Sequence, residues 1–164
     1  MNSMRKKMLS IVASMAMVLS LFVLPGSVFA ETSDATVITT ETSTLTEGDY
    51  ILNEDVTLSS LSFKSGAKVN IDLNGYTLAL NSNSTIEIKG GAQVGITNGT
   101  ISALHFHDGT KSLFNILEDS SIMVDNATID TTGSALFPQG NAASVTVTNS
   151  IIKAGVYAVG TNAS

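Results

Sequence analysis

Short runs in which apolar and polar residues alternate recur along the chain. Two runs of the form apolar-x-apolar, where x is any residue, are joined by a polar turn of five to seven residues and make up a unit that occurs four times. Alternation with a period of two is typical of a β-strand that buries one face. The first runs of the four units begin at Leu61, Ile86, Phe114 and Ala135, and the second runs begin at Val69, Val94, Ile122 and Val145.

The spacing of these units indicates a solenoid. A fifth unit begins at Tyr157, so that successive units start 25, 28, 21 and 22 residues apart. Repeats of this length bury their apolar faces by stacking on their neighbours. A leucine-rich repeat has a similar period, but the chain lacks its helix and its regular leucine pattern. Strands of three or four residues are also too short for a β-sandwich. We therefore predict an all-β fold, a parallel β-solenoid of about four to five coils.

Each unit continues after its second run through a short turn that contains asparagine and leads to a third apolar run. These turn residues are Asn74, Asn98, Asn126 and Asn149. Asparagine tolerates left-handed backbone geometry, and its amide can bond to the next coil, so we predict a structural asparagine ladder. The alternative is N-glycosylation, because acceptor sequences begin at Asn98 and Asn126, as they also do at Asn83 and Asn162.

The segment from Val69 to Leu78, with the sequence VNIDLNGYTL, carries a family resemblance. It resembles the early coils of secreted bacterial right-handed parallel β-helix proteins of the pectate-lyase-like superfamily. The resemblance covers residues 45–164 and implies a right-handed helix, but a fold does not imply a function. A pectate-lyase site would use acidic residues for Ca²⁺ and an arginine base. No arginine follows position 5, so we do not expect that chemistry here.

The N-terminus has the layout of a secretory signal peptide. Cations occupy positions 5 to 7, residues 8–24 are mostly apolar, and a Pro-Gly pair precedes the small residue Ala30. We predict a signal peptide over residues 1–30, cleaved after Ala30. The alternative is an uncleaved membrane anchor, which the helix-breaking Pro-Gly pair disfavours. The protein is therefore expected to be secreted or at the cell surface, without membrane contact after cleavage.

The remaining chain divides into two parts. Residues 31–44 are rich in Thr and Ser and are predicted to form a flexible leader, and residues 45–164 are predicted to form the coils. Leu45 to Leu58 already alternates and should form an incomplete first coil that caps the stack. The sequence stops within the turn of the fifth unit. We therefore expect the coils to be truncated at the C-terminal end, where further coils of the same chain or another subunit would cover them.

The amino-acid composition restricts the classes of molecule that the chain is expected to bind. Residues 31–164 contain five lysines and 14 acidic residues, a net charge of −9, and no arginine. Such a chain offers no basic patch for nucleic acid, and its charge also disfavours polyanionic sugars. It has no Cys or Trp, and only 5% of its residues are aromatic, which counts against a carbohydrate platform made of exposed rings. We expect no cofactor, and polysaccharide or cell-wall glycan is the partner class that the compartment favours.

Two groups of polar residues are candidate sites. Asp72 and Asp125 occupy equivalent outward positions two coils apart. Stacked strands are about 4.8 Å apart, which separates these carboxylates by about 9.6 Å, near the range of an inverting glycosidase. Ordinary surface acids are the alternative. His105, His107 and Asp108 could bind a metal in an expanded turn, or could simply belong to a solvated loop.

The sequence therefore predicts a secreted or cell-surface scaffold, adhesin-like or glycan-contacting, with no catalytic site among these residues. The alternative is the N-terminal part of a polysaccharide lyase or glycoside hydrolase whose catalytic coils lie beyond residue 164. Acid pairs with an arginine or lysine on stacked downstream coils would favour the enzyme.

Overall fold

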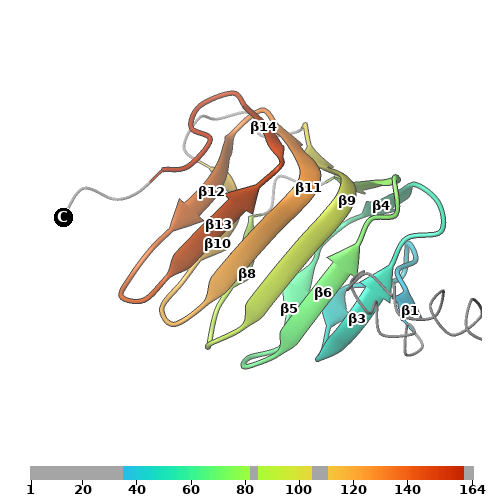
Figure 1. Ribbon diagram of the computed structural model, residues 1–164, viewed down its shortest axis with the longest axis horizontal. Helices are drawn as coiled ribbons and strands as arrows, with labels where there is room; N and C mark the ends of the chain where they lie inside the picture. The colour runs from blue at the N-terminus through green and yellow to red at the C-terminus, as the bar shows by residue number, and fades with distance from the viewer. Residues whose placement is uncertain (1–34, 82–84, 105–110, 161–164) are drawn as a thin grey trace, which may run out of the picture. The chain divides into compact units, whose positions relative to one another are not determined.

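A computed structural model describes residues 35–81, 85–104 and 111–160, and every regular element in these ranges is a β-strand (Figure 1). The strands are β1 (Thr36–Val37), β2 (Thr44–Leu45), β3 (Gly48–Ile51), β4 (Val56–Leu58), β5 (Ser62–Phe63), β6 (Lys68–Asp72), β7 (Thr77–Leu80), β8 (Ile86–Ile88), β9 (Gln93–Ala103), β10 (Ser112–Ile116), β11 (Ser121–Thr131), β12 (Ser134–Pro138), β13 (Ser144–Thr148) and β14 (Ile151–Ala154).

All the paired strands run parallel, and each pairs with the strand that follows one unit later in the sequence. The largest sheet has the order β1-β3-β6-β9-β11-β13, with β4, β7 and β14 also joined to it. A second sheet has the order β12-β10-β8, and β2 pairs with β5. Figure 1 shows the strands of the largest sheet side by side in chain order. The described residues therefore form a parallel, repeat-like all-β fold that is consistent with the predicted β-solenoid.

The strands β9 and β11 are longer than the sequence pattern predicts. Each has 11 residues and spans both the second and the third strand of its unit. The register pairs Asp125 with Thr97 and Ala127 with Gly99, so that Asn126 lies beside Asn98 between the two halves. Asn98 and Asn126 have φ angles of 59° and 50°. A single left-handed residue therefore turns each strand without ending it.

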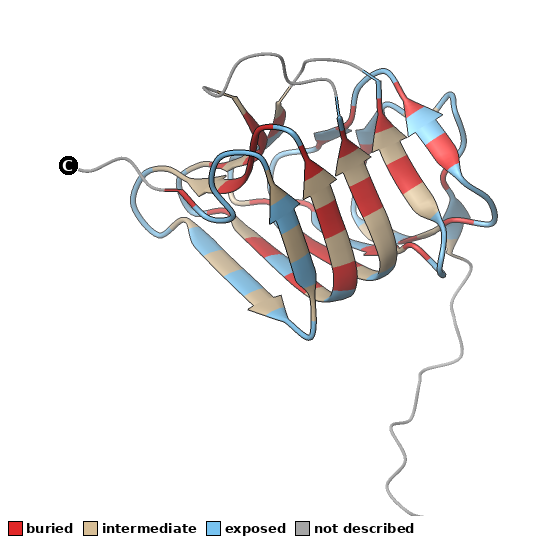
Figure 2. Ribbon diagram, turned by 90° about the horizontal axis from the view of Figure 1, so that it is seen from above, coloured by how far each residue is buried: buried red, intermediate tan, exposed pale blue. Residues whose placement is uncertain are grey.

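One continuous apolar core runs through the coils. Along β11 the residues alternate between buried and more exposed positions, as Figure 2 shows for the stacked strands generally. The inward columns carry large aliphatic side chains. Ile71, Ile96 and Val124 are no more than 1% exposed and follow one another in register on β6, β9 and β11. The alternation read from the sequence thus corresponds to stacking of like side chains from one coil to the next.

Strand pairing begins earlier than the predicted boundary at residue 45. In β1, Thr36 and Val37 pair with Tyr50 and Ile51, and the backbone N–H of Ile38 donates to the Ile51 carbonyl at 2.9 Å. Ile38 is only 1% exposed. The described end of the predicted leader is therefore part of the coils, because Ile38 reaches the core, whereas Val37 stays 42% exposed. The segment predicted to be an incomplete cap also forms three strands, β2, β3 and β4, which pair with β5, β6 and β7.

The predicted register of the last two units was wrong by one residue at each step. Phe114 pairs with Leu136 rather than Ala135, and Leu136 in turn pairs with Val159. Phe137 therefore pairs with Asn115 and is only partly buried, whereas the pattern had placed it in the core. Ala135 and Leu136 are both fully buried. Because Ala135 and Leu136 are adjacent and both apolar, the sequence does not show which of them lies in the column of Phe114. The larger side chain, Leu136, occupies that position.

The structure bears on membrane spans only from residue 35 onward. Among the described residues there is no helix of the length and apolarity needed to cross a membrane. The predicted signal peptide and its cleavage position after Ala30 lie outside the described residues.

Candidate functional site

The two candidate catalytic aspartates lie in one outward column. The register places Thr97 between Asp72 and Asp125, and Thr148 follows Asp125 on the next coil. Asp72 and Asp125 therefore lie two strands apart, as the sequence predicts, with a threonine between them. No lysine or histidine shares this column. A carboxylate pair without a third group nearby offers positions for acid and base chemistry but no further catalytic machinery.

The hydrogen bonds of the two carboxylates hold the turns together. Asp125 Oδ1 accepts from the Thr148 hydroxyl at 2.6 Å and from the Asn149 amide at 3.0 Å. The bond from Thr148, and then the bond from Asn149, hold the pKa of Asp125 below its ordinary value. Slight desolvation raises this pKa, and a bond from the Asn126 backbone lowers it further. A carboxyl with a lowered pKa is ionised at neutral pH and is not suited to act as a general acid.

Asp72 has a similar structural role two coils earlier. Its Oδ1 accepts from the backbone N–H of Asn74 at 2.8 Å and from the side-chain amide of Asn98 at 3.1 Å. Both aspartates therefore accept an amide from the asparagine of the following coil. Each carboxylate is engaged by its own coil or its neighbour, and these contacts account for both positions without a substrate.

The four turn asparagines occupy equivalent corners. Asn74, Asn98, Asn126 and Asn149 have φ angles of 50°, 59°, 50° and 49°. Their side-chain amides donate to the preceding coil, but to three different kinds of acceptor. Asn126 donates to Asn98 Oδ1 at 3.0 Å, Asn74 donates to the Leu52 carbonyl, and Asn98 and Asn149 donate to aspartates. The corner is thus a mixed ladder of amide, carboxylate and carbonyl groups.

The predicted metal ligands cannot be placed. His105, His107 and Asp108 lie outside the described residues. Within the ranges that the structure describes, no group of three or more His, Cys, Asp or Glu side chains is arranged to hold a metal ion.

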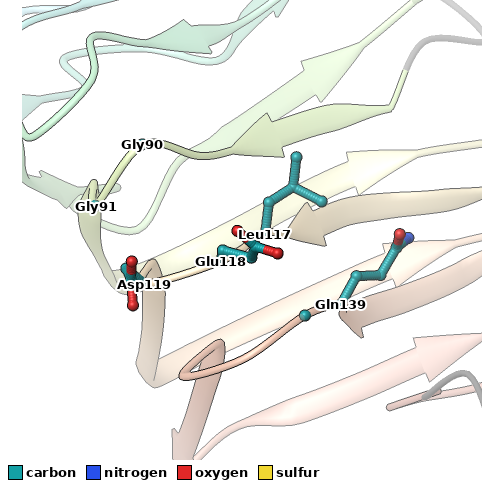
Figure 3. A pocket seen from close by; sticks show the side chains of 7 residues that line it. Gly90, Gly91, Leu117, Glu118, Asp119 and Gln139 are labelled. Atoms are coloured by element: carbon teal, nitrogen blue, oxygen red, sulfur yellow. The ribbon is translucent and has the colours of Figure 1, made fainter. Parts of the chain in front are cut away.

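A hollow of about 620 Å³ lies among the turns that follow β8, β10 and β12. Figure 3 shows Glu118 and Asp119 on one of these turns and Gln139 on the next. Ser120, which is fully buried beside them, accepts from the Gly91 N–H at 3.2 Å and donates to the Glu118 carbonyl at 3.1 Å. The buried hydroxyl at this turn is therefore satisfied within the protein, and the hollow is an open gap between turns.

A trough of about 360 Å³ crosses the outer face of the largest sheet. Asn70, Gly95, Met123 and Thr146 form one column along it. Gly95 makes the depression, since a Cβ there would lie 3.0 Å from Asn70 Oδ1. Met123 is 48% exposed. The Asn70 amide in this trough already donates to Asp49 at 2.8 Å.

The most distinctive site is a hollow of about 390 Å³ on the β8-β10-β12 sheet, which we call the aromatic hollow. The side chains that define it are Ser112, Asn115, Ser134, Phe137, Gln139 and Tyr157. The sheet register brings these residues together, because Ser112 pairs with Ser134 and Asn115 pairs with Phe137. Thr85 and Lys111 complete its rim.

The aromatic hollow contains polar groups without protein partners. Ser134 is only 5% exposed, yet among the described residues its hydroxyl has no hydrogen-bond partner. The Ser112 hydroxyl donates to Asn115 Oδ1, which leaves the Asn115 –NH₂ group without a partner in the described chain. The Gln139 side-chain amide is likewise unpaired there. Buried polar groups are nearly always satisfied by protein, water or a ligand, so these groups are available to pair with a molecule that enters the hollow.

Two aromatic rings flank these polar groups. Tyr157 is 60% exposed, and its carbonyl accepts the backbone N–H of Ala135 at 2.8 Å, which fixes it beside β12. Gly160 packs against the ring of Phe137, because a Cβ at Gly160 would lie 2.9 Å from that ring. Only a residue without a side chain fits here. The backbone at Gly160 therefore holds the Phe137 ring, and the backbone of Tyr157 is anchored to β12.

Sequence reasoning missed the aromatic hollow for a specific reason. It assigned Phe137 to the core and treated the low aromatic content as unfavourable for a carbohydrate surface. The observed register turns Phe137 outward and places it on the same hollow as Tyr157. Ser134 belongs to no repeated motif, and the pattern alone did not reveal its burial.

Comparisons of the chain with family models, with curated proteins and with solved structures found no match.

Proposed function

We propose that this protein is an exported scaffold, a right-handed parallel β-helix that is secreted or held at the cell surface and contacts glycan without cleaving it. The observation that carries the proposal is the aromatic hollow, where two rings adjoin hydroxyl and amide groups that lack protein partners. Sites that bind small polar ligands combine apolar and aromatic walls with a few such groups. The signal-peptide layout of residues 1–30 supports export.

The rest of the described surface supports a non-catalytic role. The described hydrogen bonds of Asp72 and Asp125 are made to residues in or beside the turns, and the described lining of the aromatic hollow contains no carboxylate or histidine. Glycoside hydrolysis ordinarily needs two carboxylates that face the bond to be cleaved. Among the described residues, the hollow thus has groups that suit a sugar and no carboxylate pair of the kind that hydrolysis uses.

The proposal is tested by measuring binding and turnover on the same polysaccharides. Affinity electrophoresis through gels that contain pectin, alginate, a soluble β-glucan or cell-wall glycan should show retardation on at least one of them. Reducing ends should not accumulate. Tyr157→Ala should abolish the retardation, and Tyr76→Ala, which removes another exposed tyrosine, should preserve it. Retardation on none of these glycans would refute the proposal.

The rival function is a polysaccharide lyase or glycoside hydrolase, and the column that contains Asp72 and Asp125 is the observation that favours it. Sugar release by this chain that is lost in both Asp72→Asn and Asp125→Asn would establish that activity. Export is tested separately by expressing the whole chain in a bacterial host. The secreted product should begin at Glu31, and a cell-bound product that retains residue 1 would contradict it.

A further inference from the structure

We infer that the aromatic hollow takes a neutral hexose residue, with one sugar hydroxyl bonded to the buried Ser134 side chain. This inference rests on the proposed function and specifies its ligand. It follows from three features of the hollow, which are its unpaired buried hydroxyl, its combination of rings with amides, and its charge.

The Ser134 hydroxyl requires a small polar partner. It lies in the wall of the hollow, is 5% exposed, and has no hydrogen-bond partner among the described residues. The facing Ser112 hydroxyl is already bonded to Asn115. A hydroxyl can donate one bond and accept two, so Ser134 can pair with another hydroxyl in either direction. A sugar hydroxyl has the same dual capacity and is small enough to enter a narrow recess.

The remaining groups match the two faces of a hexose. A pyranose ring has C–H groups that pack on an aromatic face and hydroxyl groups around its edge. Tyr157 offers an exposed ring, and Phe137 offers one that is partly covered. The Asn115 –NH₂ group and the Gln139 amide provide donors, and the Gln139 carbonyl provides an acceptor, close to these rings. An apolar ligand would leave these amides unsatisfied, and a polar ligand without C–H faces would not use the rings.

Charge distinguishes a neutral hexose from a uronate. The described lining contains no acidic residue, and Lys111 is its one cation. The chain carries a net charge of −6, and residues 31–164 carry −9 from five lysines and 14 acidic residues. This field disfavours a polyanionic chain, and a single lysine at the rim of the hollow offsets little of it. A neutral hexose meets no such penalty.

The test compares neutral and anionic polysaccharides by isothermal titration calorimetry on residues 31–164. A soluble β-glucan and a galactomannan serve as neutral probes, and polygalacturonate and alginate serve as anionic ones. We expect binding to at least one neutral probe and at least tenfold weaker binding to both anionic probes. Affinity for the neutral probe should change less than about twofold between low and high salt, because no charge pair is involved.

Variants locate the sugar. Tyr157→Ala should weaken binding of the neutral probe at least tenfold, whereas Tyr157→Phe, which keeps the ring, should stay within about threefold of the parent. Ser134→Ala should weaken binding about threefold to tenfold, the range of a single hydrogen bond. The same substitution should leave the melting temperature of the free protein equal or higher, because it removes an unpaired buried hydroxyl. A purely structural role would move affinity and melting temperature in the same direction.

Each outcome has a definite reading. Binding only to polygalacturonate or alginate, with the loss on Tyr157→Ala retained, would overturn the neutral ligand and leave the proposed function standing. Binding to a neutral probe that survives both Tyr157→Ala and Ser134→Ala would overturn the assignment to this hollow. Binding to no glycan would overturn the proposed function together with this inference. Ser144→Ala on the exposed β13 is the matched control and should change nothing.

Discussion

At the scale of single residues, the corner asparagines explain how two strands of a coil join without a loop. Each of the four adopts a left-handed conformation that disfavours most L-residues by about 1–2 kcal/mol. Asparagine is among the few residue types that adopt it readily, and its amide also reaches the preceding coil. One residue thus provides both the turn and a bond between coils.

Asn126 offers a way to separate these two contributions. Asn126→Gly keeps the left-handed geometry and loses only the amide bond to Asn98, so it should lower the free energy of unfolding by about 0.5–1.5 kcal/mol. Asn126→Ala loses both and should lower it by about 1–2 kcal/mol more than the glycine variant. Urea denaturation of both variants measures the difference. Equal losses would mean that the backbone conformation at this corner is not strained.

Asp125 should make stability depend on pH in the acid range. Its folded pKa is lowered, first by Thr148 and then by Asn149, whereas its ordinary value is 3.8. Between these two values the unfolded state binds more protons, so Asp125 contributes stability above about pH 4, and this is lost as the pH falls through the folded pKa. Asp125→Asn should therefore show a smaller loss of melting temperature between pH 6 and pH 3 than the parent chain.

Thr148→Ala tests whether the Thr148 hydroxyl lowers the pKa of Asp125. Removing the hydroxyl that donates at 2.6 Å should raise the pKa of Asp125 toward 3.8, which a carboxyl NMR titration measures directly. The variant should also lose part of the acid sensitivity that the parent shows. An unchanged carboxyl titration would contradict the role given to this hydrogen bond.

At the scale of elements, β9 contains two glycines with different constraints. A Cβ at Gly99 would lie 2.5 Å from the Leu73 Cβ and 2.6 Å from the Tyr76 carbonyl oxygen, so the backbones of neighbouring coils meet there. A Cβ at Gly95 would meet only the end of the Asn70 side chain, at 3.0 Å. Neither glycine has a left-handed φ angle. The two glycines therefore differ only in how much room a side chain would have.

This pair makes a matched test of coil contact. Gly99→Ala should lower the free energy of unfolding by about 1–3 kcal/mol, because the added methyl group forces two coils apart. Gly95→Ala should change it by less than about 1 kcal/mol, since a side chain can move aside and alanine restricts the unfolded chain. Chemical denaturation of the two variants checks this. Similar effects at the two positions would show that β9 lies no closer to the preceding coil at Gly99.

How far the sequence predicts these elements depends on how unambiguous each run is. Ile86-Glu87-Ile88 alternates cleanly, and the structure pairs it as expected with β10. Ala135-Leu136-Phe137 has no polar residue to fix its phase, and there the prediction slipped by one residue. The aromatic hollow depends on that phase, because Phe137 faces outward only in the observed register. The unpaired state of Ser134 depends on neighbouring coils, which a single run of sequence does not specify.

At the scale of the described molecule, each coil contacts mainly its two neighbours, so stability should vary along the stack. Val124 on β11 and Val147 on β13 occupy the same inward column in register. Val124 is fully buried, with β9 on one side and β13 on the other, whereas Val147 is only partly buried. In the described residues β13 pairs with β11 alone. The coil that contains β13 and β14 should therefore open most readily.

Hydrogen exchange on residues 31–164 tests this gradient. The hydrogen-bonded amides of β13 and β14 should exchange before those of β9 and β11, because opening the outer coil exposes little core. Val147→Ala should speed exchange in β13 and β14 and leave β6 and β9 unchanged. Val124→Ala should lower the global free energy of unfolding by about 2 kcal/mol or more, since it removes buried methyl groups from a closed core. If both variants accelerated exchange equally in every strand, the coils would unfold as one unit, and the nearest-neighbour description of this protein would fail.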